Sequence, residues 1–387
     1  MKVEQNVQRL KYLLKLYKLT VKELLELING KLKNPITSQN ILGDEIKLTH
    51  LKRIDSVFEK GLHFYLDPKS PEVSQDASIF FRKDKFDTEL NIGAKKIVNQ
   101  FEDFKISLSA IAKLAELNIE RKVPIYTLKN DPKGVAKELG QVFYPRFTSD
   151  LKDFLKALIS KFADNNILVF EFVETWNKKN KANIDGFFLN PNVIVLKRHQ
   201  IAFRREIFTL IHELGHYLLN KEEIEELEIS DLANHQLNSI EQWCNDFAFY
   251  FLAGDYANLL ENLEKAGSKN DYHHEIIGNI SKETHLSKIA LYTRLLLKDQ
   301  ISPANYRMVK DGFEEDFARR KEDERLQREL DNKSDDGRKQ KGSTPKPINS
   351  PLLVSTIQTA FNEGLMNEYE VCKTLNISPD KLDKFLQ

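Results

Sequence analysis

The stretch Phe208-Thr209-Leu210-Ile211-His212-Glu213-Leu214-Gly215-His216-Tyr217-Leu218-Leu219 decides how this chain is organised. Its apolar residues recur at helical spacing and predict a helix that is largely buried. Four residues of α-helix turn through about 400° and rise about 6 Å, so His212 and His216 project from one face. Two imidazoles at that separation can share one divalent metal ion, and Glu213 is then placed to act on a water molecule at that metal. The alternative is an ordinary helix with two surface histidines, which the apolar flanks disfavour.

Size and composition set the limits for everything else. The chain has 387 residues, enough for two or three domains, and 41% of them are hydrophobic, enough to give each domain a core. Lys plus Arg equals Asp plus Glu, at 58 each, so any basic surface must be local. The N-terminus does not resemble a signal peptide, and no apolar run approaches the roughly 18 residues that cross a bilayer. Cys244 and Cys372 offer no disulfide framework. We therefore expect a cytoplasmic protein that does not contact a membrane.

Residues 1 to about 66 are expected to form a small all-helical unit. Apolar residues at helical spacing predict helices over residues 7–17, 21–28 and 48–58, with a shorter third helix over residues 38–42 and Thr20 as an N-cap. This order resembles the XRE-type helix-turn-helix domain, and the resemblance implies DNA binding by residues 1–67. Twelve Lys and Arg against seven Asp and Glu before residue 67 leave an excess of five positive charges, as phosphate contact requires. The polar side chains that could reach base edges are those of Thr37, Ser38, Gln39 and Asn40. The alternative is a helical scaffold without DNA affinity.

A polar linker over residues 68–76 precedes a larger domain, which we place at residues 77–310. Helices are predicted over residues 90–117, 132–139 and 151–162. Three β-like runs follow at residues 167–173, 186–189 and 193–196, and the short turn Asn190-Pro191-Asn192 indicates that the last two form a hairpin. A small sheet thus leads into the His-Glu-x-x-His helix. Zinc peptidases commonly place such a sheet edge so that an extended substrate adds as a further strand, and we hold this use as a hypothesis here.

A hydrolytic zinc site usually takes three protein ligands and keeps a fourth position for water. The third ligand must come from elsewhere in the chain, and Glu241 is the preferred candidate. It lies on a helix predicted over residues 238–251, ended by Gly254, that could fold back beside the first. Asn245 follows at i+4 on the same face, suited to holding a ligand by a hydrogen bond. The alternatives are His235 and the acidic run from Glu222 to Glu228.

These segments resemble one known family. Residues 204–219, followed by Glu241-x-x-Cys244-Asn245-x-Phe247-Ala248, resemble the ImmA/IrrE metallopeptidases, and Asp185-Gly186-Phe187 with residues 193–195 is similar to that family's hairpin. An Ala-Asn usually stands where Cys244-Asn245 is found. The resemblance implies a zincin-like fold and an endopeptidase with one Zn²⁺ ion per chain, bound by His212, His216 and Glu241, with Glu213 as the base. It also implies that the substrate is a transcriptional repressor or an antitoxin. Tyr217, His235 and Arg204 are candidates for the oxyanion donor.

The last part of the chain is predicted to contain a helical segment, a charged linker and a small terminal module. Within the helical segment 271–298, residues 280–284 are expected to mark a capped start. Residues 311–350 are predicted to form a charged linker, as a fraying helix and then a flexible tether, and residues 351–387 a small C-terminal helical module. The fold class is therefore α+β and mostly helical. A second reading of the function is a DNA-binding transcriptional regulator or antitoxin whose metallopeptidase-like domain serves binding or sensing. An intact Glu213 favours catalysis, and a purely structural metal site is disfavoured because three ligands leave the coordination open.

Overall fold

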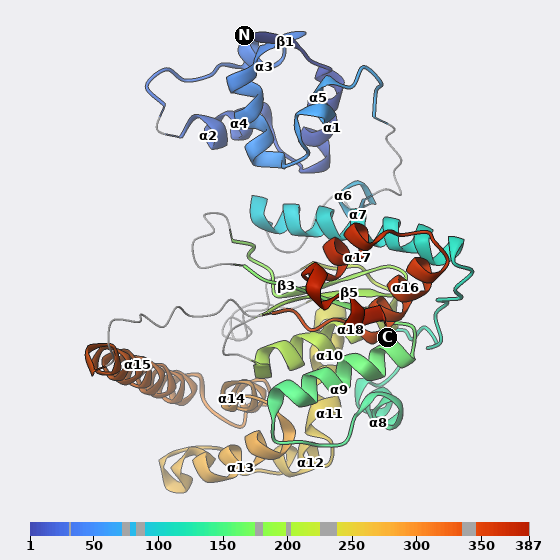
Figure 1. Ribbon diagram of the computed structural model, residues 1–387. Coiled ribbons are helices and arrows are strands. Elements are labelled where there is room, and N and C mark those ends of the chain that lie inside the picture. The colour runs from blue at the N-terminus through green and yellow to red at the C-terminus, as the bar shows by residue number, and fades with distance from the viewer. Residues whose placement is uncertain are drawn as a thin grey trace. The chain divides into compact units, whose positions relative to one another are not determined.

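The computed structural model describes residues 1–30, 32–71, 78–82, 90–174, 181–198, 203–224, 238–334 and 346–386. The chain divides into two compact units, one of residues 1–107 and 179–183 and the other of residues 108–178 and 184–387 (Figure 1). Within the described residues, no helix combines the length and the apolar character that crossing a bilayer requires. The mostly helical α+β class is confirmed. The predicted domain limits stay predictions.

The first unit is built from short helices around a small core. Its elements are β1 (Lys2–Glu4), α1 (Val7–Leu16), α2 (Val21–Asn29), α3 (Ser38–Ile41), β2 (Glu45–Lys47), α4 (Leu48–Phe58), α5 (Leu62–Leu66), α6 (Ile79–Arg82) and the first part of α7 (Ile92–Leu114). Thr20 caps α2 as predicted, in a capping box with Glu23. The expectation of an all-helical unit is wrong, because β1 pairs with β2 in an antiparallel ladder that buries Ile46 between two exposed residues. Three-residue strands are too short to show an alternating pattern in the sequence.

The second unit surrounds a three-stranded sheet. Strands β3 (Leu168–Phe172), β4 (Gly186–Leu189) and β5 (Val193–Lys197) lie in the order β3-β5-β4. The predicted hairpin is confirmed, since β4 pairs antiparallel with β5 and Phe187 faces Val195 across the ladder. β3 runs parallel to β5. The remaining elements before residue 300 are α8 (Pro132–Phe143), α9 (Leu151–Asp164), α10 (Phe203–Leu219), α11 (Ser239–Ala253), α12 (Tyr256–Glu261), the 3-10 turn η2 (Ser268–His273), α13 (His274–Thr284) and α14 (Lys288–Leu297).

Helix α10 lies at the centre of this unit. It packs against β4 and β5 on one side and against α9 and α11 on others (Figure 1). Ile207, Leu210, Ile211, Leu214 and Leu218 of α10 are fully buried in the same apolar core as α8, α9 and α11. Burial on all sides fixes the orientation of the helix, so the polar side chains that it carries are held inside the domain rather than on its surface.

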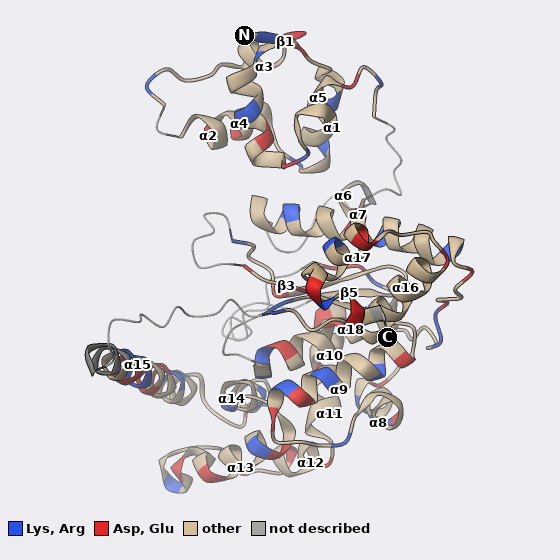
Figure 2. Ribbon diagram, viewed as in Figure 1, with Lys and Arg blue, Asp and Glu red and all other residues tan. Residues whose placement is uncertain are grey.

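The last elements depart in part from the sequence-based predictions. α15 (Pro303–Ser334) continues well into the segment predicted as a charged linker. Its charges alternate in sign (Figure 2) and pair at i,i+3, as in Arg325 with Glu322 at 2.7 Å, which stabilises an exposed helix. This agrees with the fraying helix predicted for the first part of that segment. The predicted capped start at residues 280–284 is wrong, because α13 ends there and Ser287 caps α14. The predicted C-terminal helices are present as α16 (Pro351–Asn362), α17 (Glu368–Leu375), the 3-10 turn η3 (Pro379–Lys381) and α18 (Asp383–Leu386), and α16 packs on α9.

A buried histidine predicts how the stability of this unit depends on pH. Burial, with the ring close to those of Phe147 and Phe154, lowers the pKa of His285 to about 4, and the charge of Arg204 adds to the shift while the backbone of Thr148 opposes it. The unfolded chain binds this proton below about 6.5 and the folded chain only near 4. The free energy of unfolding therefore falls as the pH drops from 6.5 towards 4, by on the order of 2–3 kcal/mol.

Chemical denaturation of the wild type and of His285→Phe between pH 4.5 and 7.5 measures this contribution. The variant keeps an aromatic ring against Phe147 but cannot titrate, so it should lose stability less steeply on acidification. If the free energy of unfolding depends on pH equally in the two proteins, His285 is not the group that causes the loss of stability.

Candidate metal centre

Helix α10 presents His212, Glu213 and His216 together inside the protein. All three side chains are at most 4% exposed. The two imidazoles lie one turn apart with their Nε2 atoms 3.1 Å from each other, as the i,i+4 spacing predicts. The Cβ of a residue in place of Gly186 on β4 would lie 2.7 Å from Thr209 Cγ2 and 3.3 Å from Glu213 Cγ, so the strand passes directly over the motif. The glycine of the hairpin therefore allows this close approach, a role that the sequence showed only as a family likeness.

Helix α11 brings a third ligand candidate to the two histidines. Asn238 begins this helix by accepting hydrogen bonds from the backbone N–H groups of Ile240 and Glu241, and Gly254 ends it, as predicted. Glu241 Oε2 lies 3.1 Å from His212 Nε2, and Glu241 Oε1 lies 3.0 Å from His216 Nε2. The structure thus brings together the three residues that the sequence singled out, and their ligand atoms all lie within 4.8 Å of one another.

Asn245 determines which nitrogen of His212 is available to a metal. Its Oδ1 atom lies 3.1 Å from His212 Nδ1 and accepts a hydrogen bond from that nitrogen. With the proton on Nδ1, the Nε2 atom carries a lone pair directed at the carboxylate of Glu241. A nitrogen lone pair and a carboxylate that face each other at 3.1 Å repel unless a cation lies between them. The donor set therefore fits a metal ion.

Geometry agrees with this fit. Ligands about 2.0–2.1 Å from a tetrahedral zinc ion lie roughly 3.3–3.4 Å apart. The two Nε2 atoms lie 3.1 Å apart, and each lies 3.0–3.1 Å from a different oxygen of the Glu241 carboxylate, so these contacts are slightly shorter than the separations in a zinc site.

Charges around the site act in opposite directions on its two glutamates. Burial raises the pKa of Glu213 to about 8; His216 opposes this shift, and Glu241 and Asp185 add to it. Burial would also raise the pKa of Glu241, but the neighbouring His216 and His212 outweigh it and hold that pKa well below its usual range. Glu241 is thus favoured as an anion, the form that a metal ligand takes, whereas burial favours the neutral form of Glu213 while no cation is bound.

A close contact between helices sets the position of Glu241. A Cβ on Gly215 would lie 3.0 Å from the Sγ atom and 3.1 Å from the Cα atom of Cys244, so α10 and α11 touch backbone to backbone at this point. Cys244 stands where the family usually has alanine, and it is fully buried against Gly215. Glu241 is three residues before Cys244 and faces the histidines across the same contact. Gly215 therefore acts on the site through helix spacing, which the spacing of the motif alone does not reveal.

Gly215→Ala should separate the two helices and weaken metal binding. Overpacking a buried contact of this kind costs about 1–3 kcal/mol. We expect a lower melting temperature and a metal affinity reduced at least about tenfold, measured by competition with a chromogenic zinc chelator. Gly312→Ala is the matched control, because the Cβ position of that helical glycine is open and alanine should be neutral or stabilising there. If both variants bind metal as tightly as the wild type does, the close spacing of α10 and α11 does not determine the metal affinity.

Other candidate residues lie elsewhere. The Tyr217 ring packs against Phe188 and beneath the guanidinium of Arg121, and Arg204 donates hydrogen bonds to the Ser281 and Leu286 carbonyls. Neither side chain is directed to the cluster as an oxyanion donor would be.

Of the remaining ligand alternatives, the structure describes Glu222 and Glu223, and neither is part of the cluster. The Glu222 carboxylate accepts a hydrogen bond from the backbone N–H of Asn190 at the hairpin turn. His235, Glu225, Glu226 and Glu228 lie outside the described residues.

In the first unit, Thr37, Ser38, Gln39 and Asn40 are all exposed on or beside α3. The Asn40 carboxamide accepts hydrogen bonds from the backbone and hydroxyl of Thr37, so these two side chains cap the helix. Ser38 and Gln39 are the two that are not used by this cap.

The buried His-Glu-x-x-His helix, the third ligand on α11 and the adjoining sheet define a metallopeptidase-like domain. Residues 165–296 match the family model of peptidase family M78, described as the IrrE N-terminal-like domain. The match covers the sheet, α10 and α11 and runs through most of α14. It supports the resemblance to the ImmA/IrrE family over this segment. Comparison with curated proteins and with solved structures gives no significant match.

Proposed function

We propose that the chain is a zinc-dependent endopeptidase whose metal ligands are His212, His216 and Glu241. One observation carries the proposal: the Nε2 atoms of His212 and His216 lie 3.1 Å apart, and each lies 3.0–3.1 Å from one oxygen of the buried Glu241 carboxylate. The buried carboxylate of Glu213 occupies the adjacent position of the helix. The match of residues 165–296 to a peptidase family supports it.

The roles of the residues follow from their positions. His212, His216 and Glu241 would hold a zinc ion, which would supply Lewis-acid chemistry by acidifying water and polarising a peptide carbonyl. Glu213 takes a proton from the attacking water and passes it to the leaving amine. Asn245 holds the His212 ring in the tautomer that leaves Nε2 free to bind. Residues on α10 and α11 are held by packing, so the site needs little rearrangement to act.

The sheet offers a way to present an extended substrate. β4 is the edge strand, and Gly186 lies against Glu213. The Lys197 N–H donates to the Asp185 carbonyl, so the main-chain groups of Gly186 and Phe188 point away from β5. A peptide that adds as a further strand beside β4 would pass within reach of Glu213. The substrate class that the family resemblance implies is a transcriptional repressor or an antitoxin.

Metal removal tests the proposal. The full-length protein should cleave a cognate repressor, lose this activity after treatment with 1,10-phenanthroline and regain it with one equivalent of zinc. Cleavage that survives complete removal of the metal would overturn the proposed function.

A second function, DNA binding by the first unit, is favoured by the exposed Ser38 and Gln39 and by the five excess positive charges before residue 67. If these charges contact phosphates, the affinity for duplex DNA should fall with salt with a log–log slope of roughly −4 to −5. Gln39→Glu should weaken binding, and Asn118→Asp, which adds a similar charge in the other unit, should not. A filter-binding titration between 50 and 200 mM salt measures this, and no binding at the lowest salt would remove the proposal.

A further inference from the structure

A cavity lies in the second unit, at the end of α11 that is remote from Glu241. Its volume is about 690 Å³, within the range of small-molecule sites. It is lined by one face of α8, the last residues of α11, the first residues of α12 and the end of α13. Tyr250 lines the cavity and follows Glu241 by nine residues on α11, about 13 Å along the helix axis. The cavity is therefore separate from the metal centre, and the inference drawn from it does not depend on the proposed function.

Aromatic side chains form much of the lining. Tyr144 and Phe147 follow α8, Tyr250 lies on α11 and Tyr256 begins α12, and all four line the cavity. Phe147 and Tyr256 are 38% and 39% exposed, high values for large rings in a unit with a well-packed core. Faces and edges of aromatic rings left open in a hollow favour a flat aromatic ligand.

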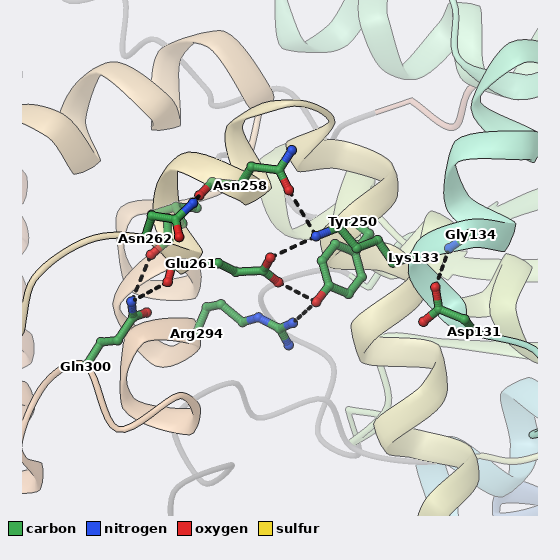
Figure 3. Close-up of polar contacts among 10 residues, drawn as sticks. Asp131, Lys133, Gly134, Tyr250, Asn258, Glu261, Asn262, Arg294 and Gln300 are labelled. Carbon is green, nitrogen blue, oxygen red and sulfur yellow. Dashed lines mark hydrogen bonds and ion pairs between the residues drawn. The ribbon is translucent and has the colours of Figure 1, made fainter.

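A network of hydrogen bonds holds one wall in place (Figure 3). The Lys133 ammonium donates to Asn258 Oδ1 at 3.0 Å and to Glu261 Oε2 at 2.8 Å. The Tyr250 hydroxyl donates to Glu261 Oε1 at 2.6 Å and accepts from Arg294 at 2.9 Å. These contacts join α8, α11, α12 and α14, so Tyr250 and the Lys133 ammonium are fixed before any ligand arrives.

The glycine at position 140 keeps the cavity open. Gly140 lies inside α8 and lines the cavity, and a Cβ built there meets no atom within 4 Å. Packing therefore does not require a glycine at this position, although glycine inside a helix is less stable than alanine. Any larger side chain at residue 140 would project into the hollow.

Charge indicates the sign of the ligand. Lys133 and Lys137 line the cavity from the same face of α8, one turn apart. Lys133 forms an ion pair with Glu261 at 2.8 Å, so its charge is already balanced. Lys137 is the lining lysine for which the described residues show no carboxylate partner, and it supplies the one positive charge that a ligand can pair with. Asp255 and Glu283 line the cavity from other elements, and these carboxylates disfavour a second negative charge on the ligand. The lysine side thus suits one anionic group next to the aromatic rings.

We propose that this cavity binds a small aromatic molecule with a single negative charge. The rings of the ligand lie among Tyr144, Phe147 and Tyr250, and its anionic group lies beside Lys133 and Lys137. The walls provide a binding surface only, and no chemical step is assigned to them.

The fluorescent probe 8-anilinonaphthalene-1-sulfonate has this chemistry and tests the proposal on the folded, full-length, zinc-loaded protein. A fluorescence titration should give saturable binding of one probe per chain. Gly140→Trp, which fills the hollow, and Lys137→Glu, which reverses the charge, should each weaken binding at least about tenfold. The matched controls are Gly312→Trp, at a helical glycine with an open Cβ position elsewhere, and Lys152→Glu, at an exposed lysine on α9, and both should bind like the wild type.

The outcomes are distinct. Loss of binding in the two cavity variants but not in the controls supports the site, and Lys137→Glu decides the matter if Gly140→Trp does not fold. Binding that is absent or not saturable, or that is equal in Lys137→Glu and the wild type, overturns the proposal. Tighter binding of the cationic dye acridine orange than of the sulfonate overturns the assigned charge. Because none of these variants alters a metal ligand, failure here leaves the proposed peptidase function untouched, and a metal-free chain should bind the probe equally well.

Discussion

Glu241→Ala is expected to purify with far less than one zinc ion per chain, while the wild type purifies with one. The Glu241 carboxylate lies 3.1 and 3.0 Å from the two imidazole nitrogens, and no other described carboxylate joins this cluster. Without it two neutral nitrogens remain, which is too few for a stable zinc site. Partners that only orient a ligand are worth about 10- to 100-fold in metal affinity, so loss of a ligand should cost more than that.

Two further variants serve as an intermediate case and as a neutral control for this experiment. Asn245→Ala removes the hydrogen bond to His212 Nδ1 but no ligand, so its zinc affinity should lie between those of the wild type and Glu241→Ala. Glu138→Ala removes an exposed carboxylate on α8 and should leave the zinc content unchanged. The measurement is metal analysis by mass spectrometry, with circular dichroism to show that each variant is folded. Full zinc occupancy in the Glu241→Ala variant would show that Glu241 is not a zinc ligand.

Glu213→Gln should retain one zinc ion per chain and lose cleavage of the substrate by roughly 100- to 10,000-fold, the usual contribution of a general base. Glutamine has nearly the same shape, so the buried position next to Gly186 stays filled. Its neutral carboxamide, however, cannot take a proton from water as a carboxylate can. Steady-state cleavage rates together with zinc content separate this result from loss of the metal. Equal rates in the variant and the wild type would show that another group acts as the base.

Local signals in the sequence predicted much of the fold. The helix with His212 and His216, the helix that starts near Asn238 and ends at Gly254, and the hairpin turn at Asn190 all depend on neighbours within a few residues, and each is present. The choice of Glu241 over alternatives nearer to His216 in the sequence needed the helix of Glu241 to fold back on α10, and the structure shows that it does.

Features that depend on distant partners were missed. The strand Lys2–Glu4 pairs with a strand more than forty residues away, and neither shows a pattern of its own. Ser281 has the sequence of a helix start, yet its hydroxyl donates to the Leu286 carbonyl, and the left-handed backbone of His285 ends α13. The contact of Gly215 with Cys244 joins two helices, so neither glycine nor cysteine reveals it alone.

The most direct test of the central claim is a comparison of new protein N-termini, by mass spectrometry, in cells that co-express the neighbouring open reading frames with either the wild type or Glu213→Gln. A zinc peptidase with Glu213 as its base should produce at least one internal N-terminus, in one of those products, that is present with the wild type and absent with the variant. The same set of N-termini in both cultures would contradict the account.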